Sequence, residues 1–211
     1  MKKIFIINGM GGCGKDTFVK FVSELVPTKH ISIIGQTKAI AQFIGWNGEK
    51  DEKSRKFLCD LKEIIDNYND SNFKYITKLV NEFKEDKETQ YLFIDIRDPK
   101  QIERAEKEFD AYSILIKRDD IQTITSNKAD AGVFDYNYHC VVNNNGTLKD
   151  LEDVAKEFVD VFNDDESLLD ESDYFLKNLI EWSQLPDEKK KEIFTKSQEV
   201  LQELVKYLLG D

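Results

Sequence analysis

The chain has 211 residues, enough for one domain with a sizeable core or for a core with an appendage. Its 41 acidic residues outnumber its 30 basic residues, which gives a formal net charge of −11. This excess of negative charge argues against non-specific binding to nucleic acid and against binding to an anionic membrane surface. No apolar run approaches the roughly 18 residues of a membrane span. We therefore expect neither nucleic acid nor a membrane as a partner.

The cysteines and the first residues indicate a cytoplasmic protein. Cys13, Cys59 and Cys140 are odd in number and scattered, without the spacing of metal ligands. Dispersed cysteines of this kind are typical of free thiols in a reducing compartment. The apolar stretch near Met1 is too short for a secretion signal and runs directly into a glycine-rich segment.

That glycine-rich segment follows an apolar run, residues 4–7, which we expect to be a buried strand. Residues 9–17 read Gly-Met-Gly-Gly-Cys-Gly-Lys-Asp-Thr. The glycines allow consecutive backbone N–H groups to point inward, and Lys15 can reach the terminal phosphates of a nucleotide. A helix should begin here with its N-terminus facing the anion. This order is that of a phosphate-binding P-loop, and its predicted nucleotide contacts are Gly9, Gly11, Gly12, Cys13, Gly14, Lys15, Asp16 and Thr17.

The same glycines also satisfy the dinucleotide-binding pattern Gly-x-Gly-x-x-Gly through Gly9, Gly11 and Gly14. A dinucleotide fold requires an acidic residue about 20 residues further on, to hold the ribose. Residues 29–35 read Lys-His-Ile-Ser-Ile-Ile-Gly, without a carboxylate. The dinucleotide pattern also gives no role to Lys15, so the P-loop is the better interpretation.

Asp16 departs from the common P-loop, in which a Ser or Thr follows the lysine and binds magnesium. Here the hydroxyl comes one position later, at Thr17. The Gly-Lys-Asp-Thr segment resembles that of phage-type deoxynucleoside monophosphate kinases and of animal-type phosphomevalonate kinases, and the Lys-x-Thr spacing is similar to that of adenylate kinases. The resemblance implies a small-molecule kinase that uses ATP and Mg²⁺. Asp16 either helps to hold the metal through water or compensates the helix dipole.

A second apolar run, residues 91–94, ends in Asp95-Ile96-Arg97-Asp98-Pro99. We expect this strand to lie beside the P-loop strand, so that Asp95 and Thr17 organise the metal and Arg97 points to the same side. The Asp-x-Arg-x-Pro segment resembles one in the deoxynucleoside monophosphate kinases that helps to form the acceptor site. We therefore predict Lys15, Asp95, Arg97 and Arg118 as catalytic residues.

Arginine is scarce in this chain, which contains only Arg55, Arg97, Arg104 and Arg118. Because arginine is the better bidentate partner for phosphate, each is a candidate for phosphate binding. Arg104 lies among glutamates and is interpreted as an ion-pair partner on the surface. In P-loop kinases the insertion between the second and third strands binds the acceptor. The predicted substrate contacts in this insertion, residues 36–88, are Lys38, Arg55 and Lys62, and Arg97 is predicted to join them.

Arg118 follows a predicted strand and begins a polar segment that extends to about residue 137, where kinases of this type carry a lid. A lid arginine stabilises the charge on the transferring group. Within this segment Asn127-Lys128-Ala129-Asp130 matches the guanine-reading motif of GTPases. We interpret the match as a coincidence, because the residues before it are mostly polar and because Asp95 begins no Asp-x-x-Gly switch.

Residues 138–148 are interpreted as a last strand, an Asn-Gly turn and the start of a helix that extends to Phe162. This segment resembles the closing strand of nucleotide kinases, which borders the adenine. His30 and His139 are expected to be packed or surface residues rather than catalysts.

The predicted fold is α/β, a three-layer P-loop fold with a parallel sheet of about five strands and a C-terminal helical extension. The expected strands are residues 3–8, 30–34, 90–96, 111–117 and 138–143. A kinase domain would comprise residues 1–162. Residues 163–211 would form an acidic linker and helices whose apolar face packs within the chain, against the core or the other tail helix, forms a homodimer or contacts a separate partner.

The leading hypothesis is a kinase that transfers the γ-phosphoryl group of ATP to a nucleoside or deoxynucleoside monophosphate. Dephospho-coenzyme A and phosphomevalonate remain alternative acceptors. A nucleotide-binding regulatory module without turnover is the alternative from another functional class.

Deleting residues 164–211 tests this division of the chain. Every motif named above precedes residue 163, so we expect the truncated protein to retain transfer activity. Because the apolar face of the tail must be buried somewhere, its removal should lower solubility or melting temperature, or change the oligomeric state measured by light scattering. A truncated protein that keeps its fold and oligomeric state but loses all activity would place part of the active site in the tail.

Overall fold

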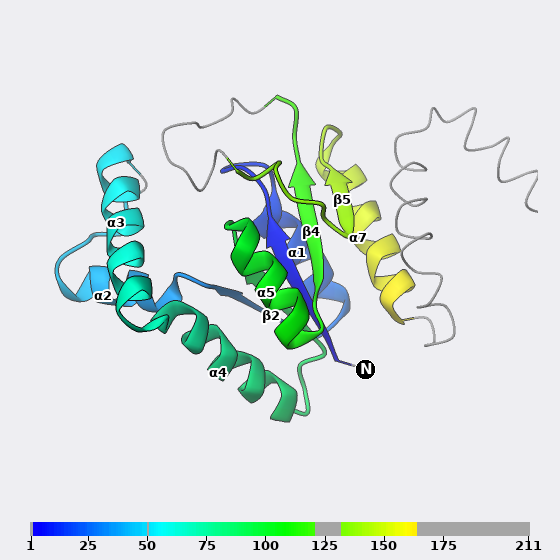
Figure 1. Cartoon of the computed structure of the whole chain (residues 1–211). Helices are drawn as coiled ribbons and strands as arrows, with labels where there is room; N and C mark the ends of the chain where they lie inside the picture. The colour runs from blue at the N-terminus through cyan, green and yellow to red at the C-terminus, as the bar shows by residue number, and fades with distance from the viewer. Residues whose placement is uncertain (1, 50, 121–131, 164–211) are drawn as a thin grey trace, which may run out of the picture.

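A computed structural model of the chain describes residues 2–49, 51–120 and 132–163 (Figure 1). The strands are β1 (Lys3–Asn8), β2 (Thr28–Ser32), β3 (Tyr91–Asp95), β4 (Tyr112–Lys117) and β5 (Cys140–Asn143). The helices are α1 (Lys15–Leu25), α2 (Gly35–Phe43), α3 (Glu52–Asn69), α4 (Ser71–Glu85), α5 (Pro99–Phe109) and α7 (Leu148–Asn163). The strands form one parallel sheet in the order β2-β3-β1-β4-β5.

β1 lies at the centre of this sheet, and all six of its residues are buried. A strand in a parallel sheet is covered on both faces, which explains why its sequence is nearly continuous in apolar residues. Because side chains alternate along a strand, Phe5 and Ile7 belong to one core cluster while Ile4 and Ile6 belong to the other.

Aromatic rings fill the core between the sheet, α1 and α7. The ring of Phe5 on β1 lies 4.9 Å from that of Phe158 and 4.8 Å from that of Phe162, both on α7. Phe18 of α1 packs on Phe158 at 5.4 Å. Edge-to-face contacts of this kind stabilise a core beyond the burial of apolar area alone. They fix α1, and with it the segment that precedes this helix, against the sheet.

The opposite face of the sheet is covered by α4 and α5. Phe73 of α4 stacks on Phe109 of α5 with ring centroids 5.4 Å apart, and Ile102 and Ala105 of α5 are fully buried. The chain therefore has three layers, with helices on both faces of a parallel sheet. The predicted α/β fold is confirmed, and the expected C-terminal helical extension lies outside the described residues.

Two strands have bounds that differ from the predicted ones. β2 begins and ends two residues earlier than expected, at Thr28 and Ser32. Ile33 follows the strand and is buried in the core cluster that α4 shares, and its N–H donates to the carbonyl of Asp95. β5 begins at Cys140 instead of residue 138. The N–H of His139 donates to the Ser113 hydroxyl instead of a backbone carbonyl of β4, which delays the ladder.

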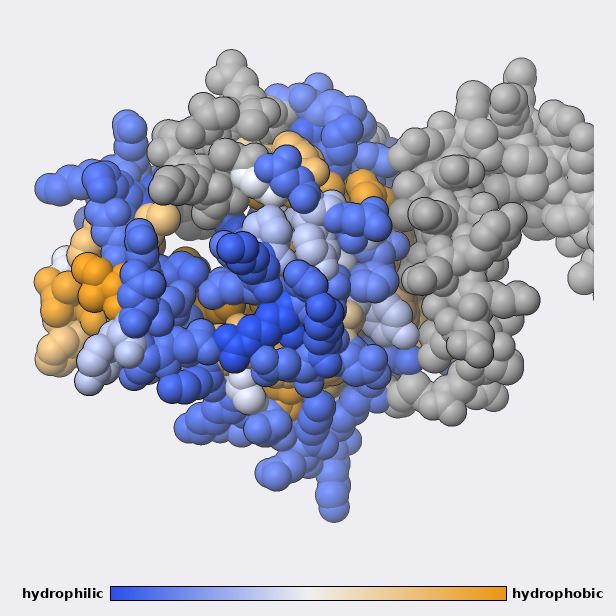
Figure 2. Space-filling view, viewed as in Figure 1, coloured by the Kyte–Doolittle hydropathy of each residue, from blue (hydrophilic) through white to orange (hydrophobic). Residues whose placement is uncertain are grey.

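Between β2 and β3 the chain forms α2, α3 and α4, which extend to one side of the sheet (Figure 1). No residue of α3 is buried, and its Ile64 is 66% exposed. At the end of α2, Phe43 is 90% exposed. Figure 2 shows apolar side chains on the surface on this side of the molecule. The insertion therefore has a thinner core than the sheet and its helices.

None of the described helices combines the length and apolar character needed to cross a bilayer.

The thiols provide a test of this packing. Cys13 and Cys140 are buried in the core beneath α1 and α7, and burial raises the pKa of both, that of Cys140 to about 12. Their thiols therefore stay protonated and shielded at pH 8, and a protonated thiol is a poor nucleophile. Cys59 on α3 is only partly buried. We expect one thiol per native chain to react rapidly with Ellman's reagent, and all three to react in denaturant.

The variant Cys59→Ser should remove the rapid phase. Two or more rapid equivalents in the native wild-type protein would contradict the burial of Cys13 and Cys140.

Candidate phosphate-binding site

The loop between β1 and α1 lies at the carboxyl edge of the sheet and is shaped by its glycines. Gly9, at φ +145°, leaves no room for a side chain, because an added Cβ would lie 2.4 Å from the carbonyl oxygen of Ile116. Gly14 precedes α1 in the left-handed region at φ +99°. L-residues with a side chain rarely adopt such conformations. The sequence therefore permits a tight loop whose end meets the helix N-terminus, a site that favours anions.

Lys15 is the first residue of α1, and its ammonium lies over this loop. Its Nζ donates to the carbonyl oxygens of Gly9 at 3.0 Å and Met10 at 3.4 Å. Asp16 is exposed in the first turn of the helix, and Thr17 is partly exposed one residue further on. The P-loop prediction thus places a cation and a hydroxyl at the N-terminus of one helix.

Two buried asparagines hold the loop from opposite ends. Asn8, the last residue of β1, accepts a hydrogen bond from the N–H of Gly9 at 2.8 Å. Asn144, in the turn after β5, donates through Nδ2 to the carbonyl of Cys13 at 2.9 Å. Buried polar groups are stable only when they are paired, so each asparagine fixes one end of the loop.

Asn8 also links the loop to two other segments. Its Nδ2 lies 2.6 Å from the hydroxyl of Tyr138 and 3.4 Å from the carbonyl of Arg97. The Tyr138 hydroxyl in turn donates to the carbonyl of Val133 at 2.7 Å. One side chain therefore joins the loop, the segment after β3 and the chain that leads into β5.

Cys13 was predicted among the nucleotide contacts, and the structure places its side chain in the core. The thiol is 1% exposed, and its Sγ is the atom that a side chain at Gly9 would strike, at 2.6 Å. Burial raises its pKa, although the charges of Lys15 and Arg97 act in the opposite direction. Only the backbone of Cys13 can therefore face a ligand.

Asp95 ends β3 beside the loop, because the parallel register pairs it with Ile7 of β1. One carboxylate oxygen, Oδ2, lies 3.1 Å from Nε2 of His30 on β2. Among the described residues no group donates a hydrogen bond to the other oxygen, Oδ1, which is buried. A buried carboxylate oxygen without a donor is costly in free energy unless a cation or another ligand satisfies it. This oxygen therefore fits the predicted role of Asp95 as a magnesium ligand, together with the hydroxyl of Thr17.

His30 was expected to be a packed or surface residue, and no sequence motif indicated its contact with Asp95. Its hydrogen bond to Asp95 raises its pKa above the usual value, and the nearby carboxylate of Asp16 adds to this effect. Burial and the charge of Lys15 act in the opposite direction. Asp16, Asp95, Lys15 and His30 thus share one electrostatic environment at the edge of the sheet.

Arg97 lies between β3 and α5, and Asn8 at the start of the loop donates to its carbonyl at 3.4 Å. The two residues after Arg97 cap and begin α5. Asp98 accepts from the N–H of Gln101 at 3.0 Å as the cap of α5, and Pro99 occupies the first turn. A capped helix start with a proline fixes the backbone that carries Arg97.

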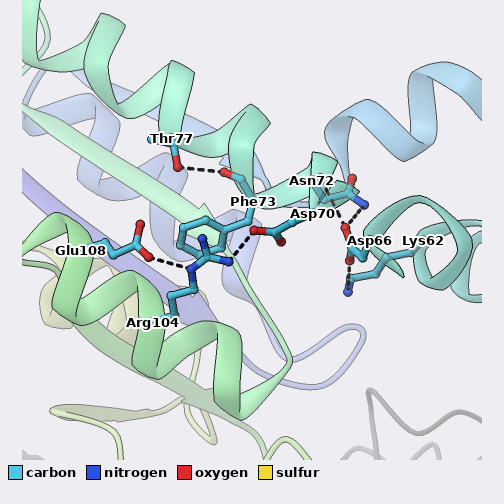
Figure 3. Close-up of polar contacts among 8 residues, drawn as sticks. All are labelled: Lys62, Asp66, Asp70, Asn72, Phe73, Thr77, Arg104 and Glu108. Carbon is cyan, nitrogen blue, oxygen red and sulfur yellow. Dashed lines mark hydrogen bonds and ion pairs between the residues drawn. The ribbon is translucent and has the colours of Figure 1, made fainter. Parts of the chain in front are cut away.

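The predicted acceptor contacts lie apart from this group, on the helices of the insertion. Lys38 is on α2, while Arg55 and Lys62 are on α3. Lys62 forms an ion pair at 2.8 Å with Asp66, one turn further along the helix (Figure 3). Arg118 is exposed just after β4. Most of the predicted lid and the Asn127–Asp130 motif lie outside the described residues.

A buried polar chain ties the three helices of the insertion together. The Thr37 hydroxyl of α2 donates to Asn72 Oδ1 at 2.8 Å, and Asn72 Nδ2 donates to Asp66 Oδ1 at 2.8 Å. Asp66 holds Lys62 through its other oxygen. The charge of Lys62 is therefore fixed on the insertion by residues that no sequence motif indicated.

Arg104 connects this insertion to α5. It forms an ion pair with Asp70 at 2.6 Å and with Glu108 at 2.7 Å, and its guanidinium lies 3.6 Å from the ring centroid of Phe73 (Figure 3). The predicted surface ion pair is confirmed, but it also spans two parts of the fold. It holds the α3–α4 junction against the helix that begins after Arg97.

His139 lies on the face of the sheet covered by α5. Its Nδ1 accepts from the N–H of Ser113 at 3.1 Å and lies 3.2 Å from Glu106 Oε1. The expectation that His139 is packed rather than catalytic is consistent with these contacts to the core of the fold.

Comparisons with known proteins find similarity only to solved structures, since no protein-family model and no curated protein matches the chain. A dephospho-CoA kinase from Campylobacter jejuni is 16% identical with a TM-score of 0.47, over 76% of this chain and 96% of that one. A thymidylate kinase from Ehrlichia chaffeensis is 15% identical with a TM-score of 0.41, over 77% and 99%. The APS kinase CysC of Mycobacterium tuberculosis is 8% identical with a TM-score of 0.35, over 76% and 96%. Identities and TM-scores this low do not determine the chemistry of the site.

Asn144 provides a test of the loop clamp. Replacing it with alanine leaves the buried carbonyl of Cys13 without a donor, a loss of about 1–3 kcal/mol in the free energy of unfolding. We expect Asn144→Ala to lower the melting temperature by a few degrees and to weaken ATP binding measured by calorimetry.

The matched control is Asn145→Ala, which removes two exposed hydrogen bonds between Asn145 and Asp119. Surface substitutions of this kind change stability by about 0.5 kcal/mol or less. Equal melting temperatures for the two variants would show that Asn144 does not hold the loop.

Proposed function

We propose that this protein is an ATP-dependent phosphotransferase that transfers the γ-phosphoryl group of ATP to a nucleoside or deoxynucleoside monophosphate. One observation carries the proposal. The Lys15 ammonium over the glycine loop, the buried Oδ1 of Asp95, to which no group among the described residues donates, and Arg97, whose carbonyl lies 3.4 Å from Nδ2 of Asn8, lie together at the carboxyl edge of one sheet. These are the parts that phosphoryl transfer requires, since its catalysis consists mainly of positioning and charge stabilisation.

The loop and Lys15 bind the donor nucleotide in this proposal. The amides of Gly9, Gly11, Gly12, Cys13 and Gly14, with those of Lys15, Asp16 and Thr17, surround its phosphates. Lys15 Nζ exchanges its bonds to the carbonyls of Gly9 and Met10 for the β- and γ-phosphate oxygens. The N-terminus of α1 adds its partial positive charge.

Thr17 and Asp95 are the residues that would hold Mg²⁺. The ion, when bound, neutralises negative charge on the β- and γ-phosphates as the bond to the γ-phosphorus breaks. Asp95 supplies the carboxylate from a fixed strand end, and Thr17 supplies a hydroxyl from the first turn of α1.

The acceptor lies on the side of Arg97 and the insertion. Arg97 binds the acceptor phosphate and offsets the charge that develops during transfer, and Arg118 does the same from the other side of the loop. Lys38, Arg55 and Lys62 contact the rest of the acceptor. The position of Lys62 depends on Asp66, since the two form an ion pair.

The same geometry admits other small phosphorylated acceptors, such as dephospho-coenzyme A and phosphomevalonate. A regulatory module that binds ATP without turnover is the alternative from another class. For the cellular setting, we propose a cytoplasmic enzyme. A homodimer through the C-terminal helices stays a prediction.

The deciding experiment measures acceptor-dependent formation of ADP. The full chain is incubated with ATP and Mg²⁺ and with each nucleoside and deoxynucleoside monophosphate, dephospho-coenzyme A or phosphomevalonate, and the nucleotides are separated by chromatography. One acceptor that raises ADP formation well above the acceptor-free rate supports the proposal. Tight ATP binding without turnover on any acceptor would favour the regulatory module.

Lys15→Ala should abolish phosphoryl transfer while leaving the fold intact, because the ammonium faces the loop and contributes nothing to the core. The checks are ADP formation and the melting temperature. Wild-type turnover by the variant would refute the assignment of the P-loop.

Arg97→Lys should damage catalysis although it keeps the charge, because an ammonium cannot reproduce the planar, bidentate contact of a guanidinium with phosphate. We expect a loss of about 10-fold or more in kcat/KM, which is about 1.4 kcal/mol of transition-state stabilisation. Arg104→Lys is the matched control, since Arg104 forms ion pairs on the helix after Arg97. Unchanged kinetics in Arg97→Lys would make Arg97 a structural residue.

A further inference from the structure

Among the described residues, His30 is the side chain that contacts the carboxylate of Asp95, with its Nε2 3.1 Å from Oδ2. The two side chains are 27% and 29% exposed, so the contact is partly shielded from water. A partly buried hydrogen bond to a carboxylate is stronger than a neutral one. The inference below rests on the proposed function, because it concerns the same metal-binding carboxylate.

The backbone around Asp95 is already fixed. Its carbonyl accepts from the N–H of Ile33 at 3.1 Å, and the register of β3 pairs it with Ile7 of β1 and Ser32 of β2. What remains free is the rotation of the carboxylate about its side-chain torsions. A single donor on one oxygen removes that freedom and determines which oxygen stays available.

His30 is well placed to provide this donor. It lies on the edge strand β2, where the register pairs it with Phe93, two residues before Asp95. Residues two apart on a strand share a face, so the ring needs only to lean along the strand to reach the carboxylate. The edge strand is anchored at its start, because the N–H of Gln90 donates to the carbonyl of Pro27 at 2.8 Å.

We propose that His30 is a positioning residue for the metal site. Its Nε2–H holds Oδ2 of Asp95 and keeps Oδ1, the buried oxygen to which no described group donates, as the metal ligand. His30 itself contacts neither the nucleotide nor the ion. Groups that orient a metal-binding carboxylate typically change metal affinity by about 10- to 100-fold when they are removed.

The experiment compares His30→Leu with His30→Gln. Leucine removes the donor, whereas the amide nitrogen of glutamine lies at a distance from Cβ similar to that of the imidazole Nε2 and restores an N–H. Calorimetry measures the affinity for ATP with and without Mn²⁺, and electron paramagnetic resonance measures free Mn²⁺, from which the bound ion follows by difference. Where an acceptor is turned over, the Mg²⁺ concentration for half-maximal rate is measured as well.

In His30→Leu we expect about a tenfold loss of Mn²⁺ affinity in the ATP complex, with metal-free ATP affinity unchanged. His30→Gln should lie within about twofold of wild type. The matched control is Lys29→Gln, the neighbour on β2, whose ion pair with Asp86 is at 2.8 Å. This variant removes a charged contact from the same edge strand and should leave both affinities unchanged.

The inference is overturned if His30→Leu binds Mn²⁺ as wild type does, or if it loses metal-free and metal-dependent ATP affinity equally. Equal losses would mean that His30 only stabilises the strand. Because these experiments measure binding and not turnover, they test the role of His30 separately from the proposed kinase activity. Metal-dependent ATP binding that requires His30, without turnover of any acceptor, would support this inference while refuting the kinase.

Discussion

The parallel pairing of β1 with β3 on one side and β4 on the other is the constraint on which the rest of the structure depends. Parallel strands end at the same edge of a sheet, so the glycine loop after β1 and the carboxylate of Asp95 at the end of β3 must lie side by side. β1 can be the central strand only because both of its faces are buried, between α1 and α7 on one side and α4 and α5 on the other. The site is thus a consequence of how the core is packed.

A loop built from glycines gains the conformations it needs but loses the side-chain contacts that would hold it in place. The structure compensates with two buried amide side chains, Asn8 at the start of the loop and Asn144 near its end. Each pairs a backbone group that the loop would otherwise leave unsatisfied. Such preorganisation matters for an anion site, because amides that are already aligned lose little entropy when phosphate binds.

The insertion between β2 and β3 is built differently. Its helix α3 buries no residue, and its order comes from the polar chain of Thr37, Asn72 and Asp66 and from the contacts of Arg104 with Asp70 and Phe73. Arg104 lies on the helix that begins just after Arg97. The insertion is therefore connected mechanically to the segment that would bind the acceptor phosphate, through α5 (Figures 1 and 3).

The sequence by itself determined the features that depend on local chemistry. The glycine loop with Lys15, the strand that ends in Asp95 and the α/β fold follow from residue spacing, because those signals lie within a few neighbouring residues. Only the tertiary structure decided which distant side chains meet. Asn144 lies 131 residues from Cys13, and no sequence motif near either residue indicates their contact. The pairing of His30 with Asp95 and the burial of the Cys13 thiol likewise depend on strand order and core packing, since each is a relation between segments far apart in the chain.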